Sequence, residues 1–224
     1  MNINKCEFHV QKIFFLKLLL FIKELKMNLR KVQAVVEWST STNLTQMQFF
    51  VDFCNFYQRF IKNFSKIVHS LIQLTQKEMI FEWDYTCQTI FDHMKKQMTE
   101  ASILRHFDQN RETILETDSF NYVNDDILSQ YDDEEILHSM IYYSKNLSLT
   151  ECNYKIYDKK LLAIIQAFKH WWSELKLTEL SIKMFIDHQA LTSLMKNKEL
   201  SRRQMRWVQK LVNFNFKIMY RSGK

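Results

Sequence analysis

The chain has 224 residues but contains no proline and only one glycine, Gly223. These two residues form most tight turns, because proline fixes φ at about −65° and glycine accepts positive φ without a steric penalty. Average usage would supply roughly fifteen glycines and eleven prolines in a chain of this length. Every turn must therefore be built from less suitable residues, a composition that indicates mutational drift or weak folding.

The rest of the composition is that of an ordinary globular protein. Hydrophobic residues make up 46% of the chain and charged residues 25%, which argues against disorder and allows one large domain or two small ones. The apolar segment from Ile13 to Ile22 is interrupted by Lys17 and is too short to span a bilayer. It also lacks the small-residue cleavage site of a signal peptide. We expect it to form a buried hairpin or helix, and we expect no membrane association.

The four cysteines are far apart in the sequence. They include no CxxC pair and have no histidine at the spacing of a zinc site: Cys6, Cys54, Cys87 and Cys152. This pattern indicates neither a metal knuckle nor a disulfide framework. We therefore expect a reducing, intracellular environment, either cytoplasmic or nuclear.

Charge is distributed unevenly along the chain. Residues 198–224 contain eight lysines and arginines and one acid, Glu199, whereas residues 108–135 contain ten acids and one base, Arg111. A basic tail beside an acidic segment is one arrangement for holding a polyanion near a cation site. Solvated faces of unrelated helices would produce the same pattern.

The first hundred residues predict mostly helices. Asn43 with Gln46 three residues later resembles a capping box at the start of a helix. Residues Phe81 to Trp83 suggest a short strand. Apolar residues recur at helical spacing in three runs: Leu44, Met47, Phe50, Val51, Cys54, Tyr57 and Ile61; Ile67, Leu71 and Leu74; and Cys87, Ile90, Phe91, Met94 and Met98.

The second half of the chain predicts a sheet with helices. Residues 113–118, 122–130 and 136–144 suggest three successive strands of an antiparallel meander. A helix beginning near Tyr157 follows, then a strand at 182–187, helical pieces around Leu191 and Trp207, and a last strand at 214–220. This order favours an α/β or α+β module with a mixed sheet.

One charged residue falls on the apolar side of the helix that begins near Tyr157. At about 100° per residue, Lys160 lies beside Ile164 and inside the apolar arc. Either the lysine extends along the helix edge to reach water, or it replaces a residue that once had a chemical role.

Two aspartates end predicted strands. Asp118 and Asp187 each follow a hydrophobic run, and carboxylates at strand ends are where such a sheet presents groups to a cleft. Hard cations such as Mg²⁺ require clustered carboxylates, usually three or four for a pair of ions. For two aspartates alone, a strand-end cap or a solvated turn residue is the favoured interpretation.

Blocks of sequence along the whole chain resemble one family in order and spacing. Five blocks resemble the ribonuclease H domain of gypsy-type long-terminal-repeat retrotransposon Pol polyproteins: ILETDSF, ILSQ, YYSKNLSLTECNYKIYDKKLLAIIQAFKHW, FIDHQAL and LSRRQMRWVQKLVNFNFKIMYRSGK. Upstream, KCEFHVQKIFFL, NLTQMQFFVDFCNFYQRFIKNFSKI and IFEWDYTCQTIFDHMKK resemble the end of the reverse-transcriptase palm, the thumb and the connection.

The resemblance implies a division of the chain into four parts. Residues 1–34 would be the tail of the palm with a primer-grip-like hairpin, 35–77 thumb-like helices, and 78–110 the connection. Residues 111–224 would be an RNase H-like mixed sheet with flanking helices, truncated at its C-terminus. The partners implied are an RNA/DNA hybrid or another nucleic acid, and the rest of a Pol polyprotein.

The resemblance also assigns the metal-binding and catalytic positions. Asp118 and Asp187 match the first and third carboxylates that bind Mg²⁺ in the family, and Lys160 stands where the family has a glutamate. The last acidic ligand would lie beyond Lys224. We expect weakened Mg²⁺ binding and little cleavage of the RNA strand, the family's reaction. The alternatives are a non-catalytic nucleic-acid-binding module or a decayed product without a selected role.

Two neighbouring aspartates do not replace the missing ligands. Asp125 and Asp126 should point to opposite faces of their strand, and Asp125 matches a family glycine that faces crowded structure. We expect an unpaired carboxylate at Asp125 to destabilise the strand. The YVNDD segment is a poor match to the polymerase motif, whose aspartates would precede Met1, so we expect no DNA synthesis by this chain alone.

Basic residues at two places predict contact with phosphates. They lie at the end of the thumb-like helix and along a helix that contains Trp207: Arg59, Lys62 and Lys66, and Arg202, Arg203, Arg206 and Lys210. Such side chains neutralise phosphates without reading sequence. The competing interpretation is that Trp207 belongs to the core and the arginines only solvate a helix face.

Overall fold

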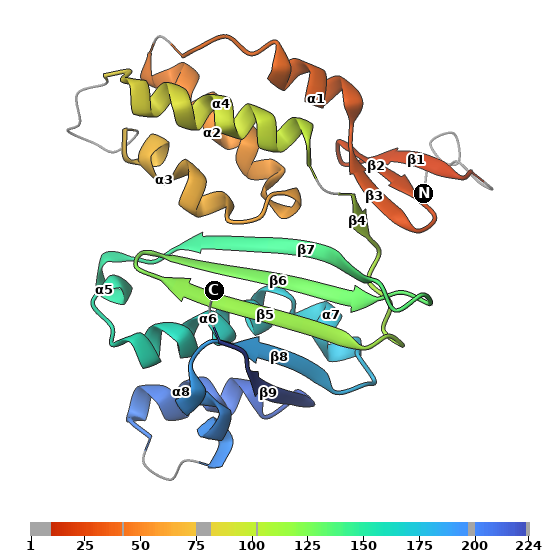
Figure 1. The fold of residues 1–224 in the computed structure, drawn as a ribbon, viewed down its shortest axis with the longest axis vertical. Coiled ribbons are helices and arrows are strands. Elements are labelled where there is room, and N and C mark those ends of the chain that lie inside the picture. The colour runs from red at the N-terminus through yellow and green to blue at the C-terminus, as the bar shows by residue number, and fades with distance from the viewer. Residues whose placement is uncertain (1–9, 42, 75–81, 102, 197–199, 223–224) are drawn as a thin grey trace, which may run out of the picture. The chain divides into compact units, whose positions relative to one another are not determined.

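The computed structural model describes residues 10–41, 43–74, 82–101, 103–196 and 200–222 (Figure 1). Contacts divide the chain into two compact units. The first contains the residues up to Ile61 together with 70–106, and the second contains 62–69 and 107–224. Each unit is described by itself.

The first unit combines helices with a small sheet. Within the helical part, the Phe50 and Phe91 rings lie 4.4 Å apart, and Cys54 Sγ lies 3.3 Å from Met98 Sδ. The four strands pair antiparallel in the order β1-β2-β3-β4. The elements are β1 (Lys12–Phe15), β2 (Leu18–Phe21), β3 (Glu24–Met27), α1 (Leu29–Val36), α2 (Leu44–Phe56), η2 (Gln58–Phe60), α4 (Tyr85–Thr99) and β4 (Leu104–Arg105), with α3 (Phe64–Leu74) shared between the units.

The predicted start of the long helix is confirmed, because the Asn43 side chain accepts a hydrogen bond of 2.9 Å from the Gln46 backbone N–H. The predicted strand at Phe81–Trp83 is wrong for Glu82 and Trp83, while Phe81 lies outside the described residues. These two residues pair with no strand and instead lead into Asp84, which caps α4. The sequence pattern does not predict strands β3 and β4, because such short segments are defined by their pairing with other strands: β3 pairs with β2 and β4, and β4 pairs with β3.

The sequence left open whether the segment from Ile13 to Ile22 is a hairpin or a helix. It forms a hairpin, but the hairpin is not buried as expected. Phe14 and Phe15 are 65% and 56% exposed, whereas Leu18 is buried. Its turn residues, Leu16 and Lys17, both have positive φ, as two-residue hairpins of the favoured twist require.

Positive φ elsewhere is likewise accepted without glycine. In the part of the chain that the structure describes, the residues with positive φ are Leu16, Lys17, Asn63, Asn121 and Glu135. Asparagine tolerates this region, but the other side chains are less suited to it and cost roughly 1–2 kcal/mol each. The turns are formed as the composition requires, at a cost in stability.

The second unit has the predicted mixed sheet, in the order β7-β6-β5-β8-β9. The first three strands form an antiparallel meander, and β8 and β9 run parallel to β5. The α/β fold class is therefore confirmed. The elements are β5 (Thr113–Phe120), β6 (Val123–Tyr131), β7 (Leu137–Asn146), α5 (Leu149–Cys152), α6 (Ile156–His170), α7 (Trp172–Leu177), β8 (Ile182–Ile186), η3 (Gln189–Lys196), α8 (Arg202–Leu211) and β9 (Phe216–Tyr220).

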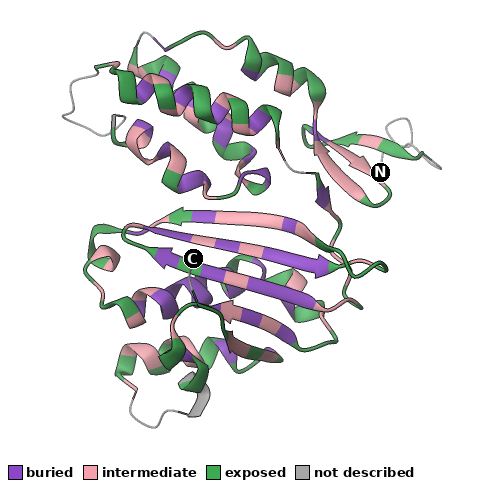
Figure 2. Cartoon of the chain, in the orientation of Figure 1, coloured by how far each residue is buried: buried purple, intermediate pink, exposed green. Residues whose placement is uncertain are grey.

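Helix α6 lies at the centre of this unit. Every residue from Lys160 to Phe168 is buried (Figure 2), because α6 packs on the sheet and also against α8. Its core partners include Leu115 of β5 and Met184 of β8. A polar residue in this stretch must therefore find its hydrogen-bond partners inside the protein.

The buried acid of strand β6 is Asp126, whereas the sequence predicted Asp125. Asp126 is only 1% exposed, and neither of its carboxylate oxygens has a hydrogen-bond partner among the described residues. Asp125 is half-buried instead, and it accepts a hydrogen bond from the Ser144 hydroxyl. The expectation for Asp125 was wrong because strand alternation turns Asp126 inward. Burial raises the pKa of Asp126 well above its ordinary value.

We predict that Asp126→Asn stabilises the protein at neutral pH by about 1–3 kcal/mol, because an amide carries no charge to desolvate. The raised folded-state pKa means that wild-type stability is highest below the unfolded pKa of about 3.9 and falls as pH rises toward the folded value. The advantage of the variant should therefore grow between about pH 4 and pH 7. Urea unfolding across this range measures it.

The exposed Asp52 provides the matched control, because Asp52→Asn should leave stability within about 0.5 kcal/mol at each pH. A loss of stability in Asp126→Asn at pH 7 would contradict the prediction.

Candidate functional site

The candidate site lies where β8 ends beside its parallel neighbour β5, which continues to Phe120. The pairing of β5 with β8 runs from Ile114 and Lys183 to Glu116 and Phe185. Asp118 lies two residues beyond the last β5 pair, and Asp187 directly follows β8. Because β5 and β8 are parallel neighbours, both carboxylates reach the same edge of the sheet, as the sequence pattern predicted.

Lys160 joins these two carboxylates. Its Nζ donates hydrogen bonds to Asp118 Oδ1 at 2.5 Å and to Asp187 Oδ2 at 2.8 Å. The Lys160 side chain is only 8% exposed, whereas those of Asp118 and Asp187 are 62% and 35% exposed. The ammonium is thus bound between two carboxylates rather than extended along the helix edge into water.

This arrangement does not fit Mg²⁺. An ion that bound both aspartates would need the position that the Lys160 ammonium takes, and the two positive charges would repel. Among the described residues no group of three or more His, Cys, Asp and Glu side chains could hold a metal ion. The residues present therefore form an ion triad in place of a carboxylate cluster.

A hollow of about 800 Å³ adjoins the triad and carries both signs of charge. Asp118 and Asp125 face each other in the β5–β6 register, and Arg221 binds Glu116. Burial raises the pKa of Asp125. The hydrogen bond from Ser144 and the positive charges of Lys66 and Lys62 partly offset this increase. Glu116 is therefore paired with a cation, whereas Asp125 is bound by a hydroxyl.

The predicted basic residues are divided between the two units. Arg59 is exposed in η2 of the first unit, whereas Lys62 and Lys66 are exposed and belong to the second. Lys62 lines the hollow beside the triad, and Lys66 lies 5.3 Å from the centre of the Phe120 ring. Of the three, Lys62 and Lys66 belong to the unit that carries the ion triad.

Helix α8 presents three of its four predicted cations to solvent. Ser201 and Gln204 form a capping box at its start, and Arg202, Arg206 and Lys210 follow at one-turn intervals and are exposed. These three side chains can contact a polyanion.

Arg203 on the same helix makes contacts within the protein. Its Nη2 lies 2.5 Å from Asp158 Oδ2, and its guanidinium lies 4.0 Å from the centre of the Tyr154 ring. Trp207 packs against the core, as the competing interpretation held. The sequence reasoning missed Asp158, because an acid in the first turn of a helix ordinarily indicates only favourable interaction with the helix dipole.

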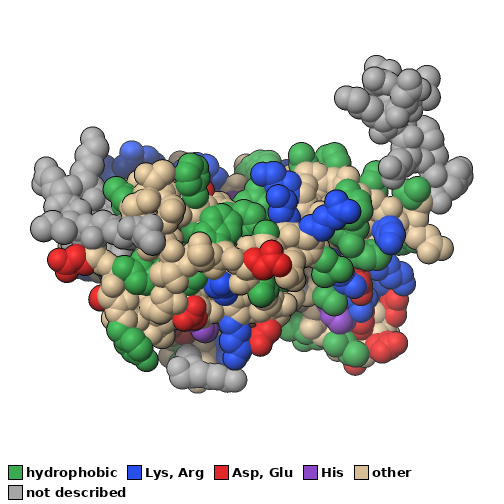
Figure 3. All heavy atoms as spheres, turned by 90° about the horizontal axis from the view of Figure 1, so that it is seen from above, with side chains coloured by type: hydrophobic (Ala, Val, Ile, Leu, Met, Phe, Trp, Pro, Cys, Tyr) green, Lys and Arg blue, Asp and Glu red, His purple; other side chains and the backbone are tan. Residues whose placement is uncertain are grey.

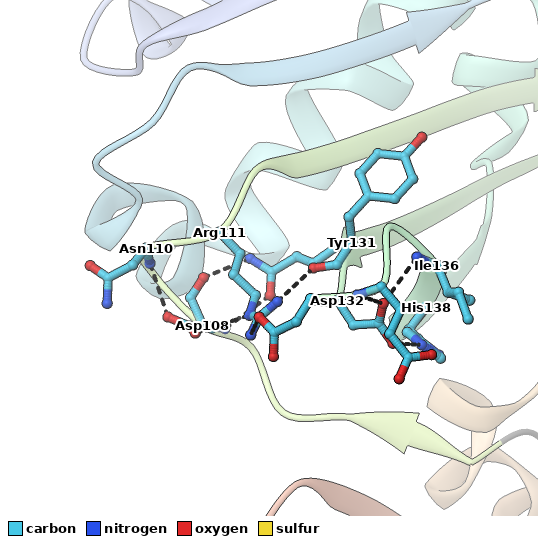
Figure 4. A network of polar contacts seen from close by, with 10 residues as sticks. Asp108, Asn110, Arg111, Tyr131, Asp132, Ile136 and His138 are labelled. Carbon is cyan, nitrogen blue, oxygen red and sulfur yellow. Dashed lines mark hydrogen bonds and ion pairs between the residues drawn. The ribbon is translucent and has the colours of Figure 1, made fainter.

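Three aspartates of the acidic segment form ion pairs or hydrogen bonds in turns at another part of the sheet: Asp108, Asp132 and Asp133 (Figure 4). Arg111 binds Asp108 and Asp133. Asp132 accepts hydrogen bonds from the backbone N–H of Ile136 at 3.0 Å and from His138 at 2.7 Å. These bonds lower the pKa of Asp132 to about 2. The charge asymmetry therefore reflects local structure in this segment.

Comparisons with known proteins agree with this architecture. Residues 83–182 match the family described as an RNase H-like domain found in reverse transcriptase. The chain is 31% identical over 224 residues to the transposon Tf2-3 and Tf2-4 polyproteins of Schizosaccharomyces pombe. The chain is homologous to a region of gypsy-type retrotransposon polyproteins. The alignment covers 99% of this chain but 17% of each polyprotein, about a sixth of their length.

Solved structures share the fold at low identity. A foamy viral protease-reverse transcriptase in complex with double-stranded DNA has a TM-score of 0.76 at 16% identity, covering 96% of this chain and 46% of that one. The corresponding structure in complex with an RNA/DNA hybrid has a TM-score of 0.73 at 17% identity, covering 96% and 30%. Of the helices that the structure describes, none is both long and apolar enough to cross a membrane.

The ion triad should respond unequally to removal of its carboxylates and to removal of its ammonium. Asp118→Asn with Asp187→Asn leaves a buried ammonium without a carboxylate, and should destabilise the protein by about 2–4 kcal/mol. Lys160→Met leaves two carboxylates that remain partly hydrated, and should cost about 1 kcal/mol or less. Urea unfolding at pH 7 distinguishes the two.

The exposed Lys217 provides a control, since Lys217→Met removes a lysine outside the triad. If Lys160→Met proved more damaging than the double aspartate variant, the ammonium could not be the buried partner of the triad.

Proposed function

We propose that this chain is a nucleic-acid-binding segment of a gypsy-type Pol polyprotein that has lost most or all of its capacity to cleave RNA. The observation that carries the proposal is the Lys160 ammonium bound to both Asp118 and Asp187. Under this proposal residues 1–34, 35–77, 78–110 and 111–224 are the palm tail, thumb, connection and RNase H-like parts. The protein would act inside the cell with the rest of the polyprotein.

The loss of cleavage follows from charge. RNase H chemistry uses carboxylate-bound divalent ions to activate water. A third carboxylate at position 160 would make the cluster more negative, whereas Lys160 neutralises half of the charge on Asp118 and Asp187. Both aspartates are already hydrogen-bonded to this internal cation. We therefore assign them as former metal ligands that now hold a lysine.

Retention of binding is supported by α8. Arg202, Arg206 and Lys210 are exposed and follow one another at one-turn spacing, which suits successive phosphates of a strand. Lys62 and Lys66 are exposed elsewhere in the same unit. Foamy viral proteins of the same fold were solved with double-stranded DNA and with an RNA/DNA hybrid, which supports such a partner for this chain.

The formal net charge of +6 also favours a polyanion. The positive charge does not form one continuous patch on the face drawn in Figure 3, where acidic, basic and apolar side chains are interspersed. Binding should therefore depend on the local row of cations on α8.

We predict no measurable cleavage of an RNA/DNA hybrid in Mg²⁺ or Mn²⁺, measured on labelled RNA by gel electrophoresis. Lys160→Glu should raise the affinity for Mn²⁺ at least about tenfold, because it replaces the bridging cation by a third carboxylate. Titration calorimetry measures this affinity without reference to activity.

Lys155→Glu makes the same charge change at an exposed position near the start of α6 and should leave Mn²⁺ affinity unchanged. Robust cleavage by the wild-type chain that disappears in Asp118→Asn would overturn the inactive assignment.

Binding to a hybrid should weaken steeply with salt, since each neutralised phosphate contributes about 0.7–0.9 to the slope of log K against log salt. Arg202→Gln with Lys210→Gln should reduce that slope by about 1.4–1.8, whereas Lys155→Gln with Lys217→Gln should not change it. Fluorescence anisotropy between about 50 and 300 mM salt measures both. A salt-independent affinity would support the interpretation that these cations only solvate the surface.

A further inference from the structure

A second hollow lies in the second unit, away from the ion triad. It is formed by α6, α7 and α8 and has a volume of about 690 Å³, within the range of small-molecule sites. Its floor is aromatic, because Phe168 and Phe214 lie 4.8 Å apart at an interplanar angle of 62°. Trp172 packs edge-on against Phe214 and remains 47% exposed. A large aromatic side chain is therefore available to a ligand.

The rim of this hollow is cationic and rich in amides. Lys169, Arg206 and Lys210 line it from two helices and are all exposed. Gln209 and Asn213 contribute side-chain amides, and no acid is among the described residues that line it. A ligand would thus meet an aromatic surface, hydrogen-bonding amides and three positive charges together.

We propose that this hollow, the aromatic pocket, binds one unpaired nucleotide of a nucleic-acid strand. A nucleobase stacks on exposed aromatic side chains, amides hydrogen-bond its edges, and cations contact the flanking phosphates. A base inside a duplex is already stacked and paired, so its faces are not available to Trp172. The proposal rests on nucleic-acid binding by α8 and narrows it to strands that contain unpaired nucleotides.

Charge complementarity selects this occupant. Arg206 and Lys210 belong both to the rim of the pocket and to the exposed row on α8, so a strand bound along α8 passes the opening. An acidic peptide would match the cations and the apolar floor, but it would make no particular use of Trp172 as a stacking surface.

The test compares two RNA/DNA hybrids by fluorescence anisotropy, one with blunt ends and one with a five-nucleotide single-stranded extension. The wild-type chain should bind the extended hybrid more tightly. Trp172→Ala should weaken binding of the extended hybrid by about 5- to 150-fold, the effect of one stacked base. Its affinity for the blunt hybrid should change by less than about twofold, and Trp172→Phe should retain most of the preference.

Tyr220→Ala is the matched control, because Tyr220 is an aromatic residue of similar exposure, 49%, on β9 and outside the pocket. It should change neither affinity, and circular dichroism checks that each variant is folded.

The outcomes separate this inference from the proposed function. If neither hybrid binds, nucleic-acid binding itself fails and the pocket assignment fails with it. If the blunt hybrid binds but Trp172→Ala affects both hybrids equally, or neither, the pocket assignment alone is overturned. The pocket assignment is also overturned if an acidic peptide competes with the extended hybrid for the pocket and a single-stranded oligonucleotide does not.

Discussion

The ion triad of Lys160, Asp118 and Asp187 is the interaction on which the candidate site depends. Its ammonium is buried at the start of a stretch of α6 that is buried from Lys160 to Phe168, and the two carboxylates are its hydrogen-bond partners. Removing a buried charge from water is costly unless partners compensate it. Because β8 ends beside its parallel neighbour β5 at the level of Asp118, the sheet supplies both partners from residues far apart in the sequence. The same contacts that satisfy the lysine take the position of a divalent ion.

Helix α6 connects the triad to the basic surface. Two residues before Lys160, Asp158 is hydrogen-bonded by Arg203 at 2.5 Å and by Gln204 at 2.7 Å. These bonds hold the start of α8 against α6, and the aromatic pocket opens farther along the same pair of helices. The exposed cations of α8 are therefore carried on an element that is fixed by a buried carboxylate. Arg203 is one of the residues that fix α8, whereas Arg202, Arg206 and Lys210 are exposed and can contact a polyanion.

Several local conflicts with the fold remain in the chain. Leu16, Lys17 and Glu135 have the positive φ that glycine adopts most readily, and Asp126 is buried without a hydrogen-bond partner among the described residues. Natural sequences usually agree with their fold at each local level, and departures are concentrated at functional sites. Here Leu16, Lys17 and Glu135 lie in turns outside the candidate site, whereas Asp126 neighbours Asp125, which lines the hollow beside the triad. The departures in the turns are consistent with relaxed constraint on stability.

The sequence by itself determined the order of elements in the second unit, because the periods of two and 3.6 residues are strong there and the strands are long. It also placed Lys160 on the inward side of α6 and Asp187 directly after its strand, whereas Asp118, expected at a strand end, lies inside β5, which continues to Phe120. Only the tertiary structure decided that the ammonium lies between both carboxylates, that Asp126 rather than Asp125 is the buried acid, and that Arg203 is bound to Asp158. Periodicity specifies which way a side chain leaves its own element, but hydrogen-bond partners come from other elements, whose positions depend on long-range packing.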